Sequence, residues 1–172
     1  MGFIFENKPS VSAHVAYSIN KYNRALWALN HLKCANIDVV TLLEVFKVML
    51  RPILEYCPPV YHYMLTISLS NDIERQQKCA LKIIYGFDQS YETLLERTGL
   101  KTLKQRRIEA CDIFANKLVN SRRFAHLFPE TIYDANTPEL RRRKKYQEQF
   151  ARTERMYKSP LFSMRTRLNE TT

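Results

Sequence analysis

Glycine is scarce in this chain, with three residues among 172. So little glycine disfavours a fold rich in strands and tight turns, and it disfavours a glycine loop that cradles phosphate. No apolar run approaches the length that spans a bilayer, and the N-terminus lacks the pattern of a signal peptide. We therefore expect an intracellular protein, cytoplasmic or nuclear, with no membrane partner.

Motifs for catalysis and metal binding are also missing. The four histidines are scattered without metal-ligand spacing, and no GxSxG nucleophile motif occurs. The four cysteines form no CxxC pair and no zinc-knuckle spacing, so we expect them to be reduced core thiols. The sequence predicts no catalytic residue, no metal site and no cofactor within this chain.

Positive charge and hydrophobic content are both high. Hydrophobic residues make up 45% of the chain, enough for most of it to fold. The net charge is +10, and it is uneven: residues 1–86 carry 9 basic and 6 acidic residues, and residues 87–172 carry 18 and 11. A basic excess of this size favours a polyanionic partner, most often nucleic acid, although a soluble domain can simply be basic.

Apolar residues at helical spacing predict a mainly α protein, with a small helical bundle over residues 11–121. One helix is expected over about 11–33, and Asp38 is a favourable N-cap for a second that ends near Tyr56. Further boundaries are expected at Ser70 or Asn71 and Gly86, at Ser90 and Gly99, and at Thr102. The predicted core side chains include Phe46, Ile53, Leu54, Ile73, Ala80, Ile83, Ile84, Leu103, Ala110, Cys111, Phe114 and Leu118.

The segment RPILEYCPPVYHY, residues 51–63, combines three prolines with three tyrosines. Pro52 removes a backbone donor and clashes with the carbonyl four residues back, so it should kink the second helix. Pro58 and Pro59 cannot continue that helix, and they push Cys57 towards an extended conformation. The tyrosines could then either cover a core or offer aromatic faces to nucleic acid.

The two ends of the chain differ from this bundle. Residues 1–10 are expected to contain a short extended segment. Residues 122–172 are interrupted by prolines and include a run of five cations, so we predict a less compact, basic C-terminal segment that is partly helical over about 139–157.

Four blocks in order resemble the reverse transcriptases of LINE-type (non-LTR, jockey-like) retrotransposons. The first, GFIFENKPSVSAHV, resembles the segment YLGVxLDxKLxWxxHI that follows the catalytic palm. The second, RPILEY followed by Pro59-Val60-Tyr61, resembles RPILEYxxPVW. Residues 69–84 resemble LexiQrrAlRiI, and SYETLLERTGLKTLKQRR resembles sYeelLkelgLpsLeeRR. A weaker similarity to C-terminal regions of jockey-like elements lies in ARTERMYKSPLFSMRTRLN.

The resemblance implies that residues 1–10 end the primer-grip hairpin, that 11–121 form a thumb-like bundle, and that 122–172 follow it. In such a polymerase the thumb holds the RNA–DNA template–primer duplex. The catalytic aspartates and their two Mg²⁺ ions would lie in the palm, which with the fingers is missing here. The chain then resembles a non-catalytic fragment, inactive alone. A helical protein-interaction module and a decayed, non-functional element copy remain alternatives.

Backbone binding requires cations along one helix face. Arg75, Lys78 and Lys82 are spaced i, i+3, i+7 and form such a stripe, although a solvated helix face has the same pattern. Lys104, Arg106 and Arg107 surround a predicted helix N-terminus, which attracts phosphate. One of these arginines could instead pair with Glu96 or Glu109.

The densest cationic run is Arg141, Arg142, Arg143, Lys144 and Lys145. If this run is helical, Tyr146, Phe150 and Tyr157 form an aromatic stripe beside it, a combination that suits RNA or single-stranded DNA. The same run could serve as a nuclear-import signal or be a plain charged tail. The partners expected are therefore RNA, DNA and RNA–DNA hybrid.

Overall fold

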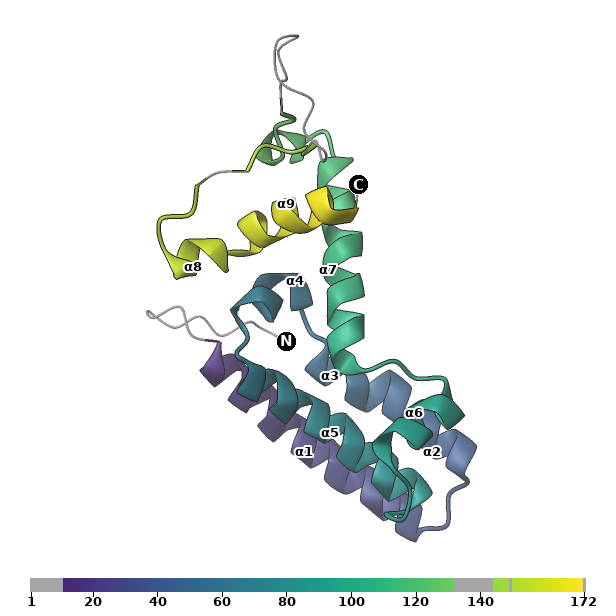
Figure 1. The fold of residues 1–172 in the computed structure, drawn as a ribbon. Coiled ribbons are helices and arrows are strands. Elements are labelled where there is room, and N and C mark those ends of the chain that lie inside the picture. The colour runs from purple at the N-terminus through teal and green to yellow at the C-terminus, as the bar shows by residue number, and fades with distance from the viewer. Residues whose placement is uncertain (1–10, 132–143, 149, 172) are drawn as a thin grey trace. The chain divides into compact units, whose positions relative to one another are not determined.

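The computed structural model describes residues 11–131, 144–148 and 150–171 and is mainly helical, as the sequence predicted (Figure 1). It divides into two compact units. Unit 1 comprises residues 1–58 and 65–107, and unit 2 comprises residues 59–64 and 108–172. This division differs from the expected bundle over 11–121, because residues 108–121 group with the C-terminal segment. The extended segment expected within residues 1–10 lies outside the described residues.

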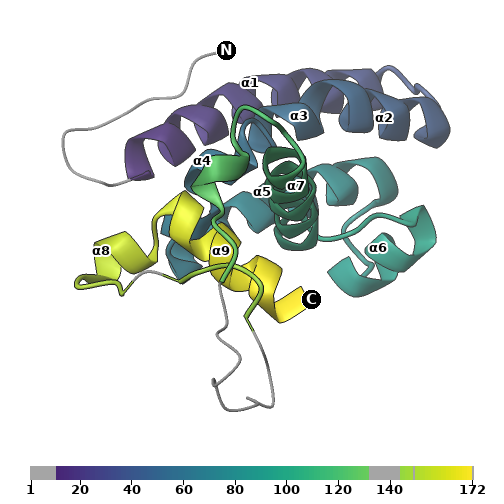
Figure 2. The same cartoon turned by 90° about the horizontal axis from the view of Figure 1, so that it is seen from above.

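Unit 1 is built from helices that pack along their apolar sides. Its elements are α1 (Ser12–Cys34), α2 (Val39–Val45), a π-helical turn η1 (Phe46–Leu50), α3 (Arg51–Leu54), α5 (Ile67–Tyr85), α6 (Tyr91–Thr98) and the first turn of α7 (Leu103–Val119). Both ribbon views show α1 alongside α5 and alongside the α2–α3 segment (Figures 1 and 2). The helix order therefore follows the predicted one within this unit.

Most predicted helix boundaries in unit 1 are confirmed by their capping bonds. Asp38 caps α2 by accepting from the Thr41 N–H at 2.9 Å, and Ser90 caps α6. Gly86 and Gly99 end their helices with positive φ angles of 102° and 63°, a region that glycine adopts without a Cβ clash. The start of α5 was predicted wrongly, because Thr66 is the N-cap rather than Ser70 or Asn71.

The core of unit 1 combines side chains from every helix in it. Phe46 and Leu54 are buried as predicted, whereas Ile53 is only half-buried. Tyr22 is fully buried on α1, and its hydroxyl donates to the Gln76 carbonyl on α5 at 3.1 Å. Burial raises the pKa of Tyr22 far above its usual value, so its proton is retained. The other fully or nearly fully buried apolar residues here are Val11, Val15, Leu29, Leu42, Leu50, Ile73, Ala80, Leu81, Ile84, Leu94 and Leu103.

Pro52 is preceded by a helical turn with altered hydrogen bonding. The turn Phe46–Leu50 is π-helical, and the Arg51 N–H donates to the Phe46 carbonyl five residues back. A proline cannot donate and its ring crowds the carbonyl four residues before it, so a wider turn relieves both problems. The expected disruption thus appears as a π-helical turn. Cys57 is not extended as predicted: its φ is +57°, in the left-handed region.

Unit 2 is smaller and less regular. It contains most of α4 (Pro58–Tyr61), the 3₁₀ turn η2 (His62–Met64), the remainder of α7, the 3₁₀ turn η3 (Ala125–Leu127), α8 (Glu154–Tyr157) and α9 (Pro160–Thr171). Within the described part of the unit, pairing of extended backbone is limited to one bridge between Glu130 and Tyr146. Figure 1 shows α9, in yellow, crossing the later part of α7.

Unit 2 has a core of its own, so its described part is more ordered than the sequence suggested. Ala115, Phe128, Tyr146, Met164 and Leu168 form the buried cluster. Side chains of α9 add polar contacts to the backbone of preceding loops. The Arg165 guanidinium donates to the Leu127 carbonyl. Asn169 accepts from the Tyr146 N–H at 2.9 Å and donates to the Tyr146 carbonyl at 3.0 Å.

Several predictions for the second half of the chain are wrong. The described residues 144–148 and 150–153 are not helical, so the helix expected over 139–157 is confined to Glu154–Tyr157 there. Helix α9 was not predicted. Phe114 is 42% exposed rather than buried, because Cys111 and Ala115 form the inward side of α7. All four cysteines are free thiols, but only Cys111 is a core residue; Cys34 and Cys57 are exposed.

Candidate nucleic-acid interface

The cationic row of α5 lies where the sequence places it, on the outer side of that helix. Arg75 and Lys78 are exposed, and Lys82 is half-buried. Among the described residues, no salt bridge joins Arg75 or Lys78 to a carboxylate, although Lys78 is near enough to Glu92 of α6 to help lower the pKa of that carboxyl. The Lys82 ammonium lies over the Phe87 ring, 5.9 Å from its centroid. Arg75 and Lys78 are therefore available to an anionic ligand, while Lys82 is partly engaged.

Helix α5 is held firmly beneath this row. Ile73, Ala80, Leu81 and Ile84 are buried on the side opposite to the cations. The Lys33 ammonium of α1 donates to the Ile84 carbonyl at 3.0 Å, near the end of α5. A row of charges on a helix so packed keeps fixed spacing, which is the requirement for contacting successive phosphates.

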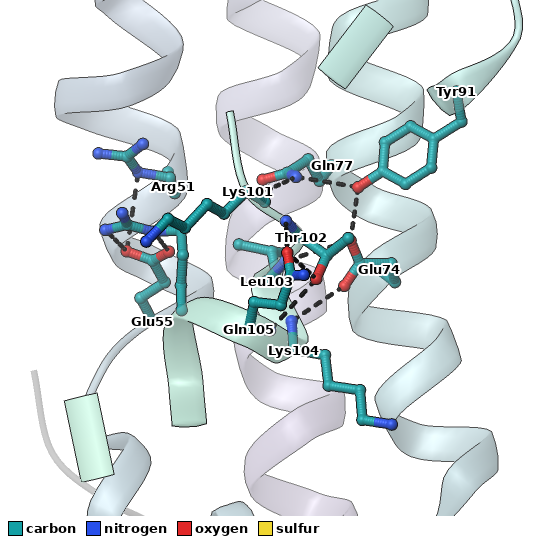
Figure 3. Close-up of polar contacts among 11 residues, drawn as sticks. Arg51, Glu55, Glu74, Gln77, Tyr91, Lys101, Thr102, Leu103, Lys104 and Gln105 are labelled. Carbon is teal, nitrogen blue, oxygen red and sulfur yellow. Dashed lines mark hydrogen bonds and ion pairs between the residues drawn. The ribbon is translucent and has the colours of Figure 1, made fainter. Parts of the chain in front are cut away.

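The N-terminus of α7 is capped by the chain itself. Thr102 and Gln105 form a capping box: the Gln105 N–H donates to the Thr102 hydroxyl at 3.2 Å, and the Thr102 N–H donates to Gln105 Oε1 at 3.1 Å. The Glu74 carboxylate from α5 accepts from the next two donors, the N–H groups of Leu103 at 3.1 Å and Lys104 at 3.2 Å (Figure 3).

Tyr91 and Gln77 support this carboxylate. The Tyr91 hydroxyl donates to Glu74 Oε1 and accepts from the Gln77 amide at 2.9 Å, and the same amide donates to the Lys101 carbonyl at 3.1 Å (Figure 3). Gln77 is fully buried. Burial, followed by the hydrogen bond to Glu74, raises the pKa of Tyr91 well above its usual value, so the hydroxyl remains a donor. The network therefore fixes Glu74 at the helix terminus.

This arrangement removes one reason for expecting phosphate there. The N-terminal N–H groups of a helix attract anions because they lack partners. Here Glu74 supplies the negative charge and Thr102 and Gln105 satisfy the remaining donors. The Glu74 carboxylate therefore occupies the N-terminus of α7, where a phosphate was expected. The Lys104 side chain is exposed and could still contact a phosphate near this terminus.

Arg106 and Arg107 are engaged within unit 1. The Arg106 guanidinium contacts both carboxylate oxygens of Glu55, with Nη2 to Oε2 at 3.0 Å, and Arg51 approaches the same carboxylate at 3.7 Å. Arg107 is 1% exposed and donates to the Ser70 hydroxyl at 2.8 Å. Burial and the adjacent Arg106 lower the pKa of Arg51. Arg106 and Arg107 thus both stabilise unit 1, and Glu55 is a partner of Arg106 that the sequence did not predict.

The basic run near residue 141 is only partly described. Arg141, Arg142 and Arg143 lie outside the described residues. Lys144 pairs with Glu148, and Lys145 is exposed with its ammonium 5.5 Å from the centroid of the Tyr146 ring. The Lys144 hydrogen bond and a second one from Asn169 lower the pKa of Glu148 despite its partial burial, so it stays ionised. Lys145 is thus the more available of the two described lysines.

The three aromatic residues predicted beside this run do come together, although they do not share one helix. Tyr146, Phe150 and Tyr157 all line one cavity of unit 2, together with Phe162. Tyr146 is buried, whereas Phe150 is 86% exposed and Tyr157 is 55% exposed. Sequence reasoning missed Phe162 because it missed α9. Ser159-Pro160 was the available signal, since proline favours the first position of a helix.

In the tyrosine-rich segment 51–63, two of the tyrosines contribute to the protein interior. Tyr61 is 2% exposed, and Tyr63 packs against the buried cluster of unit 2. Burial raises the pKa of Tyr63 above its usual value. These observations favour the interpretation in which the aromatic residues of 56–63 cover a core.

The described part of the chain lacks two features, a cluster of metal ligands and a helix that could cross a membrane. No group of three or more His, Cys, Asp or Glu side chains there is arranged to hold a metal ion. No described helix combines the length and the apolar character needed to cross a bilayer.

The chain was compared with protein-family models, with curated proteins and with solved structures. None of them matches it.

Proposed function

We propose that this chain is the non-catalytic, thumb-like part of a LINE-type reverse transcriptase and that it contacts RNA–DNA duplex through the phosphate backbone. The observation that carries the proposal is the open cationic row of α5, in which Arg75 and Lys78 are exposed on a firmly packed helix. The four sequence blocks and the net charge of +10 support the same assignment.

The dimensions of the row suit a nucleic-acid backbone. Seven residues separate Arg75 from Lys82, which corresponds to about 10.5 Å along a helix axis at about 1.5 Å per residue. One strand of a duplex advances about 3.4 Å per nucleotide along its axis, so a row lying parallel to that axis would span about three nucleotide steps. The backbone of Lys104 lies close to this row, because its N–H contacts Glu74, one helical turn from Lys78, and its side chain is exposed. Such contacts position a duplex without reading its sequence.

The test is a double variant, Arg75→Gln with Lys78→Gln, titrated with a 16-base-pair RNA–DNA hybrid between 50 and 200 mM salt. Affinity for the hybrid should fall, and the slope of log affinity against log salt should flatten by roughly 0.9 for each lost phosphate contact. Lys21→Gln with Arg24→Gln is the matched control, since these two residues are also exposed, also spaced i, i+3, and lie on α1. Equal slopes for the two double variants would contradict the proposal.

The polymerase chemistry belongs to the absent palm under this proposal. Primer extension on an RNA template with Mg²⁺ or Mn²⁺ should therefore give no product with this chain alone. Template-dependent extension would refute the fragment assignment.

A helical protein-interaction module is the second candidate, and one observation favours it. Val40, Val48 and Met49 on α2 and η1 are 65–72% exposed, and Trp27 on α1 is 65% exposed. Exposed apolar side chains of this kind can form a docking surface. Recognition through them would barely change between 50 and 200 mM salt, whereas duplex binding through phosphates would weaken steeply.

A further inference from the structure

A cavity of about 580 Å³ lies in unit 2 beside residues 144–151 and helices α8 and α9. Its lining is rich in aromatic rings and includes Tyr146, Phe150, Tyr157 and Phe162, with Lys144 and Glu148 as charged members. Pockets that bind small molecules or single groups of larger ones measure about 300–1,000 Å³ and combine apolar walls with a few polar groups. The volume of this cavity falls within that range, and the cavity is open to solvent.

Two of the aromatic rings that line the cavity are largely exposed to solvent. Phe150 is 86% exposed and Tyr157 is 55% exposed, and both line the cavity. Tyr157 also packs against Phe162, with ring centroids 5.2 Å apart and planes tilted by 51°. This contact helps to orient the Tyr157 ring, and more than half of the residue's surface stays accessible. The cavity therefore presents ring faces to a planar ligand.

The net charge of the cavity lining differs from that of the surface beside it. Lys144 and Glu148 neutralise each other, and Glu148 also accepts from the Asn169 amide at 3.0 Å. The interior thus suits a neutral planar group better than an isolated anion. Outside it, Lys145 is exposed, with its ammonium 5.5 Å from the centroid of the Tyr146 ring that lines the cavity. Positive charge next to a neutral aromatic cavity matches a neutral base carried on a phosphate backbone.

We propose that this cavity binds an unpaired base of single-stranded nucleic acid, stacked on Phe150 and Tyr157, with its phosphates beside Lys145. Stacking on aromatic rings accepts any base, so binding should depend little on sequence. The proposal goes beyond the duplex contact of α5 and does not depend on it, since the cavity lies in the other unit and takes a base that no complementary strand covers.

The test compares two single-stranded 12-mers, one of oligouridylate and one with abasic residues on the same phosphate backbone. Phe150→Ala in the full chain should weaken binding of oligouridylate by about 5- to 150-fold, the range that corresponds to loss of one stacked base. The same variant should bind the abasic 12-mer like the parent chain. Phe150→Tyr keeps a ring and should retain most of the affinity.

Two controls test whether the effect is specific to the cavity and whether each variant stays folded. Phe114→Ala removes another exposed phenylalanine of unit 2 that does not line the cavity, so it should change neither affinity. Circular dichroism checks the helix content of each variant, which should not change because Phe150 packs little of its surface. The proposal is overturned if the parent binds both 12-mers equally, if it binds neither, or if Phe150→Ala leaves oligouridylate binding intact. The hybrid-duplex titration is independent of these results.

Discussion

Unit 1 and unit 2 are stabilised in different ways. Unit 1 buries apolar stripes of several helices against one another, and Leu42, Phe46, Leu50 and Leu54 of one continuous segment are each at most 3% exposed. Unit 2 has five residues in its buried cluster and relies on α9 side chains that bond to loop backbone. Apolar packing tolerates many arrangements of similar volume, whereas a bond to one carbonyl requires one geometry.

The difference shows how each unit should respond to substitution. Loss of a large core side chain leaves a cavity and removes transfer free energy. Loss of a polar partner leaves a backbone group without its hydrogen bond. The first effect should dominate in unit 1 and the second in unit 2.

The largest effect is expected from Phe46→Ala in unit 1. Phe46 is fully buried, so its truncation should lower the free energy of unfolding by about 3–5 kcal/mol. Urea unfolding followed by circular dichroism would measure it. Val48→Ala, two residues further along the same π-helical turn and 69% exposed, is the control and should change stability by less than about 0.5 kcal/mol. Equal effects would mean that the apolar side of this helix is misassigned.

Asn169→Ala should have the next largest effect, confined to unit 2. The substitution leaves the Tyr146 N–H and carbonyl without their partner, at a cost of about 1–3 kcal/mol. Amide hydrogen exchange would show faster exchange at Tyr146 and across α9, with unchanged rates in α1 and α5. Uniformly faster exchange in both units would contradict the separate stabilisation of unit 2.

Tyr91→Phe tests the polar part of unit 1. It removes a donor to Glu74 and an acceptor for Gln77, while the Glu74 contacts to α7 remain possible. We expect a loss of about 1–3 kcal/mol, since two hydrogen bonds of about 0.5–1.5 kcal/mol each are removed. Thermal unfolding would measure it, with Tyr85→Phe as a control that removes a hydroxyl from the same unit. A loss as large as that of Phe46→Ala would show that polar bonds rather than packing dominate unit 1.

The smallest effect should come from the charge of Glu148. Its folded-state pKa is lowered, chiefly by the Lys144 hydrogen bond, so ionised Glu148 stabilises unit 2 at pH values above its usual pKa range. That contribution is lost as pH falls through the lowered pKa, and for a partly exposed pair it should not exceed about 1 kcal/mol. Glu148→Gln should therefore narrow the stability difference between pH 6 and pH 3. Glu154→Gln, at a more exposed pair, is the control.

The sequence predicted unit 1 far better than unit 2, and the reason is physical. Helical periodicity and caps such as Asp38, Ser90 and Gly99 are local signals, so they identify helices before any tertiary contact is known. The bond between Asn169 and Tyr146 joins residues 23 positions apart, and no local pattern indicates it. The helix expected over about 139–157 is wrong for the described residues 144–148 and 150–153, where Tyr146 instead bonds through its backbone to Asn169.

The candidate site shows the same contrast between local signals, which the sequence reveals, and contacts between helices, which it does not. Spacing alone placed Arg75, Lys78 and Lys82 on one side of α5, which the structure bears out. Spacing could not show that Glu74 occupies the N-terminus of α7 or that Glu55 takes Arg106, because both are contacts between separate helices. A carboxylate in one helix can satisfy cations and N–H groups that a local pattern would assign to a ligand.

The π-helical turn before Pro52 has a consequence for how this chain can vary. Leu42, Phe46, Leu50 and Leu54 recur every four residues, and removal of one residue between Phe46 and Leu50 would change the spacing to 4, 3 and 4, the pattern of an uninterrupted α-helix. The segment is thus an ordinary helix carrying one surplus residue, and the surplus makes room for the proline. Related chains should gain or lose the two together: an insertion without the proline would rotate half of the apolar stripe away from the core, and a proline without the insertion would clash with the preceding turn.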